Sequence, residues 1–552
     1  MLNSVVRFAA IIVYLISAPV LAAQTAEWTW VTHAGAVGTN GSMGISADPA
    51  GNSYITGYFL GSPNFGATNL DNQGDRDIFV AKLSPSGEWL WAASAGGGDD
   101  DEGLSVSHDS AGNAYVTGFF TGTATFGPFS VTSVPATYED IFVAKLSPTG
   151  TWLWVKSAGA AVGDYGNAIH ADSAGNIWVA GEFFGQVAFG STTLTSAGSR
   201  DIFVAKLSPS GEWLWAKNGG STGQDAALGL DIDTAGNSWV TGWFRGTATF
   251  GSHTLAVSGS DDVFAAKLDP AGNWLWASRA GGAEEDQAWG ISVDPAGNSF
   301  VTGFFVGTAA FGAQNLTGPG MADVFVAKLD PEGNWLWANS GGGPSHDFSY
   351  GVAANPAGNA FITGYFNSPA AFGGTNLTGM EAELYVAKIS DAGDWMWAKS
   401  AGGEGWDWAR GAAAVSDGSC RVTGTFGLLA AFGPIQVTAV SGDDIFAAKI
   451  SADGTWTDDH LSPTIGDQAW LSGVFPNPLR CGEIAFAKAF LPSDASGSLA
   501  LYNLRGQRLF SRELGPGEHQ LDLPLSGLTS GVYFLRLTAS AGAVTKKIIL
   551  LD

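Results

Sequence analysis

Hydrophobic and polar residues alternate in short segments along most of this chain, and residues 290–338 show the pattern clearly. Asn298–Phe305 (NSFVTGFF) and Asp323–Leu329 (DVFVAKL) alternate and are rich in β-branched and aromatic residues, which predicts two strands. Asn334–Ala338 (NWLWA) predicts a third strand, and the small residues of Gly290–Asp294 (GISVD) predict a fourth. The turns DPAGN and DPEGN join Asp-Pro, which starts a turn, to Gly-Asn, which accepts positive φ. The segment therefore predicts a four-stranded antiparallel unit.

This unit recurs along the chain at intervals of 60 to 63 residues. The tryptophan pairs (W-x-W) of its last strand begin at Trp28, Trp89, Trp152, Trp213, Trp274, Trp335 and Trp395. Seven four-stranded units at even spacing predict an all-β fold, a seven-bladed β-propeller. A linear β-solenoid is the alternative, but its rungs are usually much shorter than these repeats.

The order of strands predicts how the ring is built and closed. We expect the strand of small residues to lie innermost, where blades crowd the axis, and the tryptophan strand to lie outermost and to pack blade against blade. Glu27–Trp30 (EWTW) is a tryptophan strand without the rest of its unit, so we expect it to close the last blade and to remove the exposed edges. Thr455–Thr457 could compete for that place, but it has a single tryptophan and runs into two aspartates.

Two segments lie outside the repeats. The apolar run Phe8–Ala23 follows Arg7 and ends in small residues, which is typical of a cleaved signal peptide over residues 1–23. We expect the propeller over residues 24–457 and a linker over 458–473. From Trp470 onward the composition changes, to eight Lys/Arg and six Asp/Glu, and alternating segments with Gly-containing turns predict a small C-terminal β-sandwich over 474–552.

Composition narrows the function classes. The formal net charge is −26, which argues against nucleic acid and anionic lipid as partners, because both require a Lys/Arg surface. After the leader no apolar stretch is long enough for an integral membrane span. The two cysteines, Cys420 and Cys481, provide no disulfide framework, although one bond between them could form in an oxidising compartment. No H-E-x-x-H, G-x-S-x-G or P-loop motif occurs, so we predict no catalytic residue and no cofactor.

An acidic position recurs ten residues after the second tryptophan of each pair. It is occupied by Asn40, Asp101, Asp164, Asp225, Asp286, Asp347 and Asp407. Such a ring could bind a cation such as Ca²⁺ or a polyhydroxylated ligand. The alternative, which strict repetition favours, is that each Asp accepts hydrogen bonds from the backbone of its own turn. The neighbouring residues vary between units and include Trp289, Trp406 and Trp408, whose rings would suit a sugar- or peptide-binding surface.

Two parts of the chain resemble known families. ISVDPAGNSFVTGFF followed by DVFVAKLDPEGNWLWA resembles the SBBP-type bacterial β-propeller repeat, over roughly Trp28–Trp456. This resemblance implies an extracellular bacterial protein; it does not imply a known catalytic set, so no catalytic residue is carried over. The tail is similar to the C-terminal sorting domain of the type IX secretion system. The matching positions are Pro476, Asn477, Pro478, Gly506, Gly531, Val532, Tyr533, Lys546 and Lys547. This resemblance implies inner-membrane passage by the signal peptide and outer-membrane passage by the type IX secretion machinery.

These observations predict an exported, non-catalytic binding or adhesion protein, secreted or held at the cell surface. We expect a monomer whose loop face binds extracellular carbohydrate or a surface protein. Two alternatives stay open: an extracellular propeller hydrolase or lyase acting on polysaccharide, and a purely structural surface module.

Overall fold

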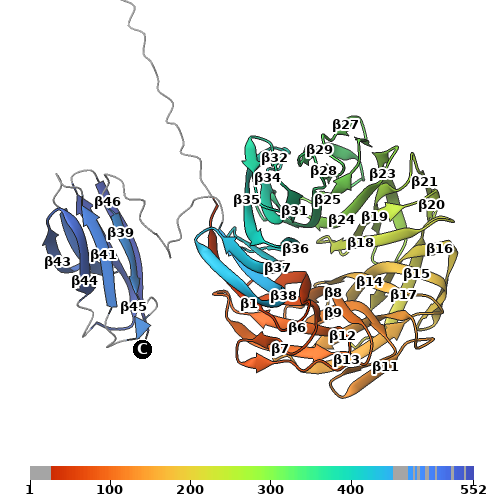
Figure 1. Cartoon of the computed structure of the whole chain (residues 1–552), viewed down its shortest axis with the longest axis horizontal. Coiled ribbons are helices and arrows are strands. Elements are labelled where there is room, and N and C mark those ends of the chain that lie inside the picture. Colours follow the sequence, from red (N-terminus) through yellow and green to blue (C-terminus); the bar gives the residue numbers. More distant parts are fainter. Residues whose placement is uncertain are drawn as a thin grey trace, which may run out of the picture. The chain divides into compact units, whose positions relative to one another are not determined.

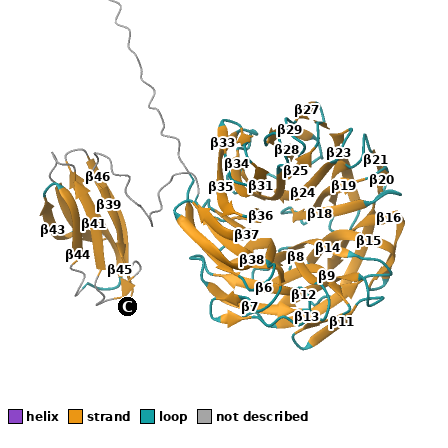
Figure 2. Ribbon diagram, viewed as in Figure 1, coloured by secondary structure: helices purple, strands orange, loops and turns teal. Residues whose placement is uncertain are grey.

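The computed structural model describes residues 26–451, 470–475, 479–480, 485–491, 497–503, 507–523, 528–539 and 542–551. All regular elements in these residues are β-strands (Figure 2). The described residues therefore contain no helix that is long and apolar enough to cross a membrane. The chain divides into two compact units, Met1–Gly454 and Thr455–Asp552. The all-β prediction is therefore confirmed.

The first unit consists of four-stranded antiparallel groups that follow one another along the chain. Within each group the strands are given in the order in which they are hydrogen-bonded, from the innermost to the outermost. The first three groups are β2 (Gly41–Ala47), β3 (Ser53–Phe59), β6 (Asp77–Leu83), β7 (Trp89–Ala95); β8 (Asp101–His108), β9 (Ala114–Thr121), β12 (Glu139–Leu146), β13 (Trp152–Ala158); and β14 (Tyr165–Ala171), β15 (Ile177–Phe189), β16 (Thr192–Leu207), β17 (Trp213–Gly219). The groups that follow are β18 (Asp225–Ile232), β19 (Ser238–Phe244), β22 (Asp262–Leu268), β23 (Trp274–Gly282); β24 (Asp286–Val293), β25 (Ser299–Phe305), β28 (Asp323–Leu329), β29 (Trp335–Gly341); β30 (Phe348–Ala354), β31 (Ala360–Asn367), β34 (Ala382–Ile389), β35 (Trp395–Glu404); and β36 (Trp408–Ala414), β37 (Cys420–Phe432), β38 (Ile435–Ile450), β1 (Trp28–Ala34).

Short hairpins extend the connection between the second and third strands of a group. They are β4 (Asn64–Phe65) with β5 (Thr68–Asn69), β10 (Thr123–Phe126) with β11 (Phe129–Thr132), β20 (Thr247–Phe250) with β21 (His253–Ala256), β26 (Thr308–Phe311) with β27 (Gln314–Thr317), and β32 (Ala370–Phe372) with β33 (Thr375–Leu377). In the β15–β16 and β37–β38 pairs, the long strands themselves continue into this extension.

The first strands of successive groups lie side by side around a common axis. β2 contacts β8, β8 contacts β14, and the series continues to β36, which contacts β2 again (Figure 1). Small residues permit this crowding: a Cβ added to Gly290 of β24 would lie 2.9 Å from the carbonyl oxygen of Tyr350 in β30. The arrangement confirms the predicted β-propeller.

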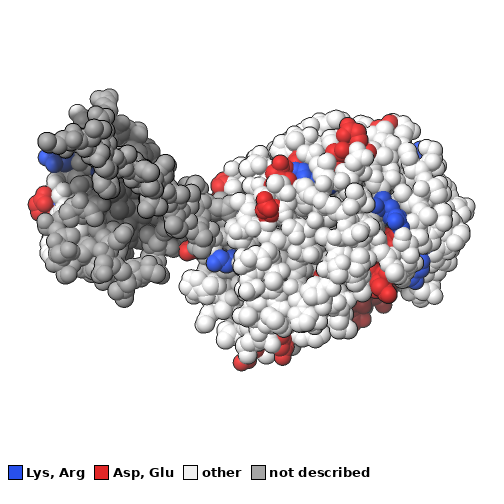
Figure 3. All heavy atoms as spheres, turned by 90° about the horizontal axis from the view of Figure 1, so that it is seen from above, with Lys and Arg blue, Asp and Glu red and all other residues white. Residues whose placement is uncertain are grey.

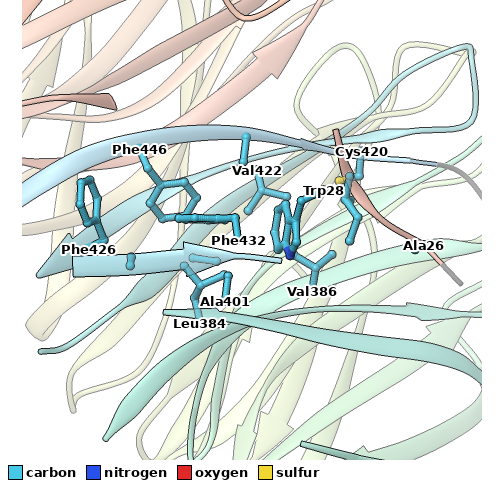
Figure 4. Packing of buried hydrophobic residues seen from close by; sticks show 14 of the residues in the cluster. Ala26, Trp28, Leu384, Val386, Ala401, Cys420, Val422, Phe426, Phe432 and Phe446 are labelled. Carbon is cyan, nitrogen blue, oxygen red and sulfur yellow. The ribbon is translucent and has the colours of Figure 1, made fainter. Parts of the chain in front are cut away.

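The N-terminal strand joins the group that ends the repeats. β1 runs antiparallel to β38, with Val31 opposite Ala448. Trp28 is buried there, and its ring meets the ring of Phe432 edge-on with centroids 5.1 Å apart (Figure 4). This pairing covers an edge of β38 that would otherwise present free backbone groups to another chain. The competing segment Thr455–Thr457 lies outside the described residues.

The tryptophans of the outer strands connect each group to its neighbour. The second tryptophan of a pair donates from Nε1 to a turn of the following group, as Trp276 does to the Pro331 carbonyl oxygen at 3.0 Å. The glycine of that turn leaves room for the indole, because a Cβ on Gly333 would lie 2.6 Å from the Trp276 ring. The first tryptophan meets a phenylalanine edge-on, as Trp335 meets Phe311 at 5.3 Å. These rings therefore pack the propeller together, as predicted.

The second unit contains two sheets. One is formed by β39 (Trp470–Phe475), β41 (Ala485–Leu491) and β44 (Gly517–Leu523), and the other by β40 (Leu479–Arg480), β46 (Gly542–Leu551), β45 (Gly531–Ala539), β42 (Gly497–Asn503) and β43 (Arg508–Leu514). Leu499, Leu501, Leu535 and Leu537 are buried on alternating positions of the larger sheet, as in a sandwich with one covered face. The predicted β-sandwich is confirmed.

The predicted sorting positions fall in different parts of this unit. Gly531, Val532 and Tyr533 begin β45, and Lys546 and Lys547 lie in β46 opposite the same strand. The buried Tyr533 donates its hydroxyl hydrogen to the Thr529 carbonyl oxygen at 2.8 Å. The remaining positions, Pro476, Asn477, Pro478 and Gly506, lie outside the described residues, as does Cys481.

Candidate ligand-binding site

The innermost strand of every group contains a β-bulge at the same place. In β24 the register passes over Trp289, because Ala288 lies opposite Gly303 and Gly290 lies opposite Thr302. In the groups that residues 26–451 form, the extra residues of the inner strands are Met43, Leu104, Asn167, Leu228, Trp289, Tyr350 and Arg410. All of them are half-buried. A bulge turns its extra side chain out of the regular alternation, so each inner strand presents one variable residue on the inner side of the ring.

Aromatic side chains from three neighbouring groups form a continuous series, here named the aromatic arc: Trp289, Tyr350, Tyr365, Trp408 and Trp406. Successive ring centroids lie 5.0, 6.1, 5.7 and 5.8 Å apart. Two members are bulge residues, so the arc follows the inner side of the ring. Trp406 is 61% exposed, while the other four rings are half-buried. The arc thus combines an exposed indole with a packed aromatic base.

The arc also holds hydrogen-bond donors and a cation. The indole N–H groups of Trp289 and Trp408 are buried and meet no acceptor among the described residues. The guanidinium carbon of Arg410 lies 4.2 Å from the ring centroid of Tyr350 and 4.7 Å from that of Trp408. Cation–π contact of this kind orients a guanidinium while leaving its N–H groups available.

The rest of the inner ring has a different character. The bulge residues Met43, Leu104 and Leu228 are aliphatic. Near them Arg76 donates to Glu102 at 2.5 Å and lies over the ring of Tyr58, so its charge is already paired. The side chains that could recognise an asymmetric ligand are therefore concentrated in the aromatic arc.

The recurrent aspartates are part of the backbone structure of their loops. Asp347 is 0% exposed, its Oδ2 accepts the Gly343 N–H at 2.6 Å, and its Oδ1 accepts the Asn367 N–H at 3.0 Å. The same two bonds recur in the other loops, at Asp101, Asp164, Asp225, Asp286 and Asp407. Because these side chains have no exposed surface and both oxygens are used, the geometry supports the turn-forming alternative rather than ligand binding.

A second carboxylate lies beside each of these aspartates. In the loop of Asp347 it is Asp323, which begins β28; its Oδ2 accepts the Gly320 N–H at 3.0 Å, but its buried Oδ1 has no hydrogen-bond partner among the described residues. Gly342 lies between the two groups with φ +144°: a Cβ there would lie 2.6 Å from Asp323 Oδ1 and 2.9 Å from Asp347 Oδ2. Only glycine allows this approach.

Burial makes these carboxyl groups weak acids. The pKa of Asp347 is raised to about 7, mainly by burial and to a smaller extent by the neighbouring Asp323, while the two backbone hydrogen bonds oppose this rise. Burial likewise raises the pKa of Asp323. The loop of β2 differs, because Asn40 replaces the aspartate there and accepts the Leu60 N–H at 3.1 Å. Its carboxylate neighbour Asp444 is thus paired with a neutral amide.

Neither a metal centre nor the surface hollow of the propeller provides a stronger candidate. Within the residues the structure describes, no group of three or more His, Cys, Asp or Glu side chains is placed to hold a metal ion. A hollow of about 520 Å³ is lined by Asp201, Gly220, Trp274 and neighbouring residues. Most of these occupy recurrent positions of the repeat, so they do not distinguish this hollow from gaps between other groups.

The structure therefore separates the predicted site residues into two sets. The six aspartates are buried in their own loops, whereas Trp289, Trp406 and Trp408 meet in the aromatic arc. Sequence reasoning missed Tyr350, Tyr365 and Arg410. A signal for two of them was present, since the position three residues after the recurrent Asp is the one that reads Met, Leu, Asn, Leu, Trp, Tyr and Arg in successive units.

Charged side chains on the surface of the propeller are distributed rather than clustered on the side that Figure 3 shows. On the side of the propeller shown in Figure 3, acidic and basic side chains are scattered over a mainly uncharged surface. The net charge of −26 is thus not gathered into one acidic patch on that side.

Comparison with known proteins identifies the tail. Residues 473–551 match the family model of the secretion system C-terminal sorting domain. The chain is 23% identical to an uncharacterized WD repeat-containing protein of Acanthamoeba polyphaga mimivirus, over 75% of this chain but only 37% of the relative's length. The sorting prediction for the tail is confirmed, and a domain of this kind directs a protein to the cell surface or beyond, so this is an exported propeller protein.

Two solved structures are similar over 95% of this chain. One is a fungal alcohol oxidase of the AA5 family in complex with copper, with 13% identity, full coverage of that chain and a TM-score of 0.37. The other is PorZ, a surface component of the type IX secretion system of Porphyromonas gingivalis, with 11% identity, 75% coverage of that chain and a TM-score of 0.22. At these TM-scores neither structure bears on the fold or the activity of this chain.

Proposed function

We propose that this protein is a non-catalytic, carbohydrate-binding, seven-bladed propeller of the SBBP type. In this proposal residues 1–23 form a signal peptide and the tail is handled by the type IX secretion machinery. The mature protein acts as a monomer outside the cell or at its surface. The observation that carries the binding role is the aromatic arc on the inner side of the ring.

The chemistry of the arc suits a sugar. A pyranose presents C–H groups on one face, which pack on an aromatic ring, and hydroxyl groups at its edge, which need hydrogen-bond partners. Trp406 offers a ring that is 61% exposed, and the indole N–H groups of Trp289 and Trp408 are unused donors deeper in the arc. Variation of the bulge residue from strand to strand gives an asymmetric surface, as recognition of an asymmetric ligand requires.

The direct test is binding of the full-length protein to an array of extracellular polysaccharides and oligosaccharides. Trp406→Ala and Trp408→Ala should each weaken binding of the best ligand about tenfold or more, because a stacked ring lost from a binding surface removes a major contact. Leu336→Ala is the matched control, since Leu336 is 49% exposed on the outer strand β29, away from the arc.

The outcomes separate the alternatives. Binding that is unchanged in both tryptophan variants would contradict a carbohydrate site at the arc. Release of shorter oligosaccharides or unsaturated products during incubation would favour the hydrolase or lyase alternative. A protein that binds no glycan on the array, while remaining folded, would favour the structural module.

A further inference from the structure

Arg410 forms no ion pair among the described residues of the ligand-binding region. The carboxylate whose pKa its charge lowers, Glu102, is already bonded to Arg76. Arg410 is the bulge residue of β36, it is half-buried, and its guanidinium carbon lies over the rings of Tyr350 and Trp408. No carboxylate of the described residues lies within ion-pair distance of it. The two rings fix the position of the guanidinium plane, and the N–H groups at its edge remain available to a ligand.

The other arginines of the propeller, in the described range 26–451, have acidic or backbone carbonyl partners, although the buried Nε of Arg421 has no hydrogen-bond partner among the described residues. Four of them form ion pairs: Arg76 with Glu102, Arg200 with Glu182, Arg245 with Asp261, and Arg279 with Asp262. Arg421 is 1% exposed, and its Nη2 donates to the backbone carbonyl oxygens of Gly51 and Pro85. Unlike the four ion-paired arginines, Arg410 is held by two aromatic faces and by a hydrogen bond to the Tyr350 side chain.

This difference matters in a protein with a net charge of −26. A half-buried arginine has lost part of its hydration, and an acidic chain offers many carboxylates that could have paired with it. The repeat instead places Met43, Leu104 and Asn167 at the equivalent positions of other inner strands. A guanidinium without an ion pair lies over Trp408, whose ring in turn contacts the exposed Trp406, and this arrangement has the chemistry of a subsite for an anionic group.

We infer that Arg410 is a specificity-determining residue that binds the carboxylate of an acidic sugar, a uronate, stacked on the aromatic arc. This inference rests on the proposed carbohydrate-binding function and adds the substrate class. A carboxylate is the favoured anion because its two oxygens match the paired N–H groups of a guanidinium edge. A sulfate ester on a neutral sugar presents oxygens of similar spacing and is separated by the test below.

The test compares three probes on the full-length protein by titration calorimetry. They are an oligogalacturonate, the same oligomer with its carboxyl groups reduced to the neutral sugar, and a sulfated neutral galactan oligomer of equal length. The unmodified protein should bind the oligogalacturonate about tenfold or more tightly than the reduced oligomer, as charge-assisted hydrogen bonds do. Arg410→Gln should remove this preference, so that the variant binds the acidic and the reduced oligomer equally tightly.

Arg410→Lys keeps the charge but not the paired N–H groups, so it should retain part of the preference and make it more sensitive to salt. Thermal unfolding of each variant verifies that the propeller is intact. Equal binding of the acidic and reduced oligomers by the unmodified protein would overturn the role of Arg410 and leave the carbohydrate function standing. Stronger binding of the sulfated oligomer than of the uronate would overturn the assignment to a carboxylate. Failure to bind any probe would count against both proposals.

Discussion

The buried carboxyl pairs make the stability of the propeller depend on pH in an unusual direction. Asp347 has a pKa of about 7 in the folded protein against 3.8 for an ordinary aspartate, because it is buried beside Asp323. Folding therefore favours the protonated form. The resulting stabilisation is complete below pH 3.8 and is lost as the pH rises to about 7, so deprotonation destabilises the fold across this window.

The size of the effect follows from the shift in pKa. One carboxyl moved from 3.8 to about 7 changes the free energy of unfolding by at most about 4 kcal/mol, at about 1.4 kcal/mol per pH unit. Similar buried carboxyl pairs in other loops should add to this loss of stability as the pH rises. We therefore expect the melting temperature of the protein to fall as the pH is raised from 5 to 8, in contrast to proteins whose carboxylates are paired with cations.

A variant isolates one pair. Asp347→Asn removes the titrating group while its amide oxygen can still accept the Asn367 N–H, as Asn40 accepts the Leu60 N–H in its own loop. The free energy of unfolding is measured by urea titration at pH 5, 6, 7 and 8. Between pH 5 and pH 7 it should fall with pH less steeply in the variant, by up to about 1.4 kcal/mol per pH unit, and between pH 7 and pH 8 the two slopes should converge. Glu332→Gln, at an exposed turn position, is the control and should leave the slope unchanged. A stability that rises from pH 5 to pH 8 would refute the reasoning.

Three further predictions concern single features of the chain. Gly342→Ala should lower the free energy of unfolding by about 2 kcal/mol or more in urea titration, because φ is +144° and the added Cβ would press on two carboxylates. Gly374→Ala is the control and should change the free energy of unfolding little, since a Cβ there would meet nothing within 4 Å. Equal effects of the two substitutions would contradict the role given to Gly342. Deletion of Glu27–Val31 should lower the melting temperature by many degrees, since the buried Trp28 alone contributes about 3–5 kcal/mol, and an unchanged value would show that β1 does not close the ring. Deletion of Val474–Asp552, which holds nearly all of the sorting domain, should leave the protein in the periplasm in a fractionation assay; normal export would exclude a sorting role.

Much of the fold could be predicted because the repeat states it many times. Asp-Pro and Gly-Asn turns, alternating strands and tryptophan pairs at a constant interval each support the same four-stranded unit, and errors in one copy are corrected by the others. The packing of the tryptophans followed from the same pattern, as the Nε1 bond of Trp276 to Pro331 shows. Strand pairing at the bulges could not be predicted, because one extra residue in β24 leaves no mark on composition.

The site was harder to predict for a physical reason. An aspartate that accepts two backbone N–H bonds and an aspartate that binds a ligand are the same residue, and only the burial of Asp347 and its contacts with Gly343 and Asn367 distinguish them. Arg410 could not be recognised from its neighbours in sequence alone. Trp408 lies two residues before it on β36, but its second aromatic partner, Tyr350, comes from the adjacent inner strand β30. Variation at a repeated position was the informative signal, more than repetition itself.

The pairing of β1 with β38 also determines when the propeller can close during synthesis and folding. The Glu27 N–H donates to the Ser451 hydroxyl oxygen at 2.9 Å, and the two residues are 424 positions apart in sequence. The first strand can therefore pair only after almost the whole propeller has been synthesised. Contacts between such distant residues form late in folding. A chain that ends before β38 leaves β1 without a partner strand and the ring open. Pairing of β1 with β38 is therefore possible only in a chain that contains the full set of repeats.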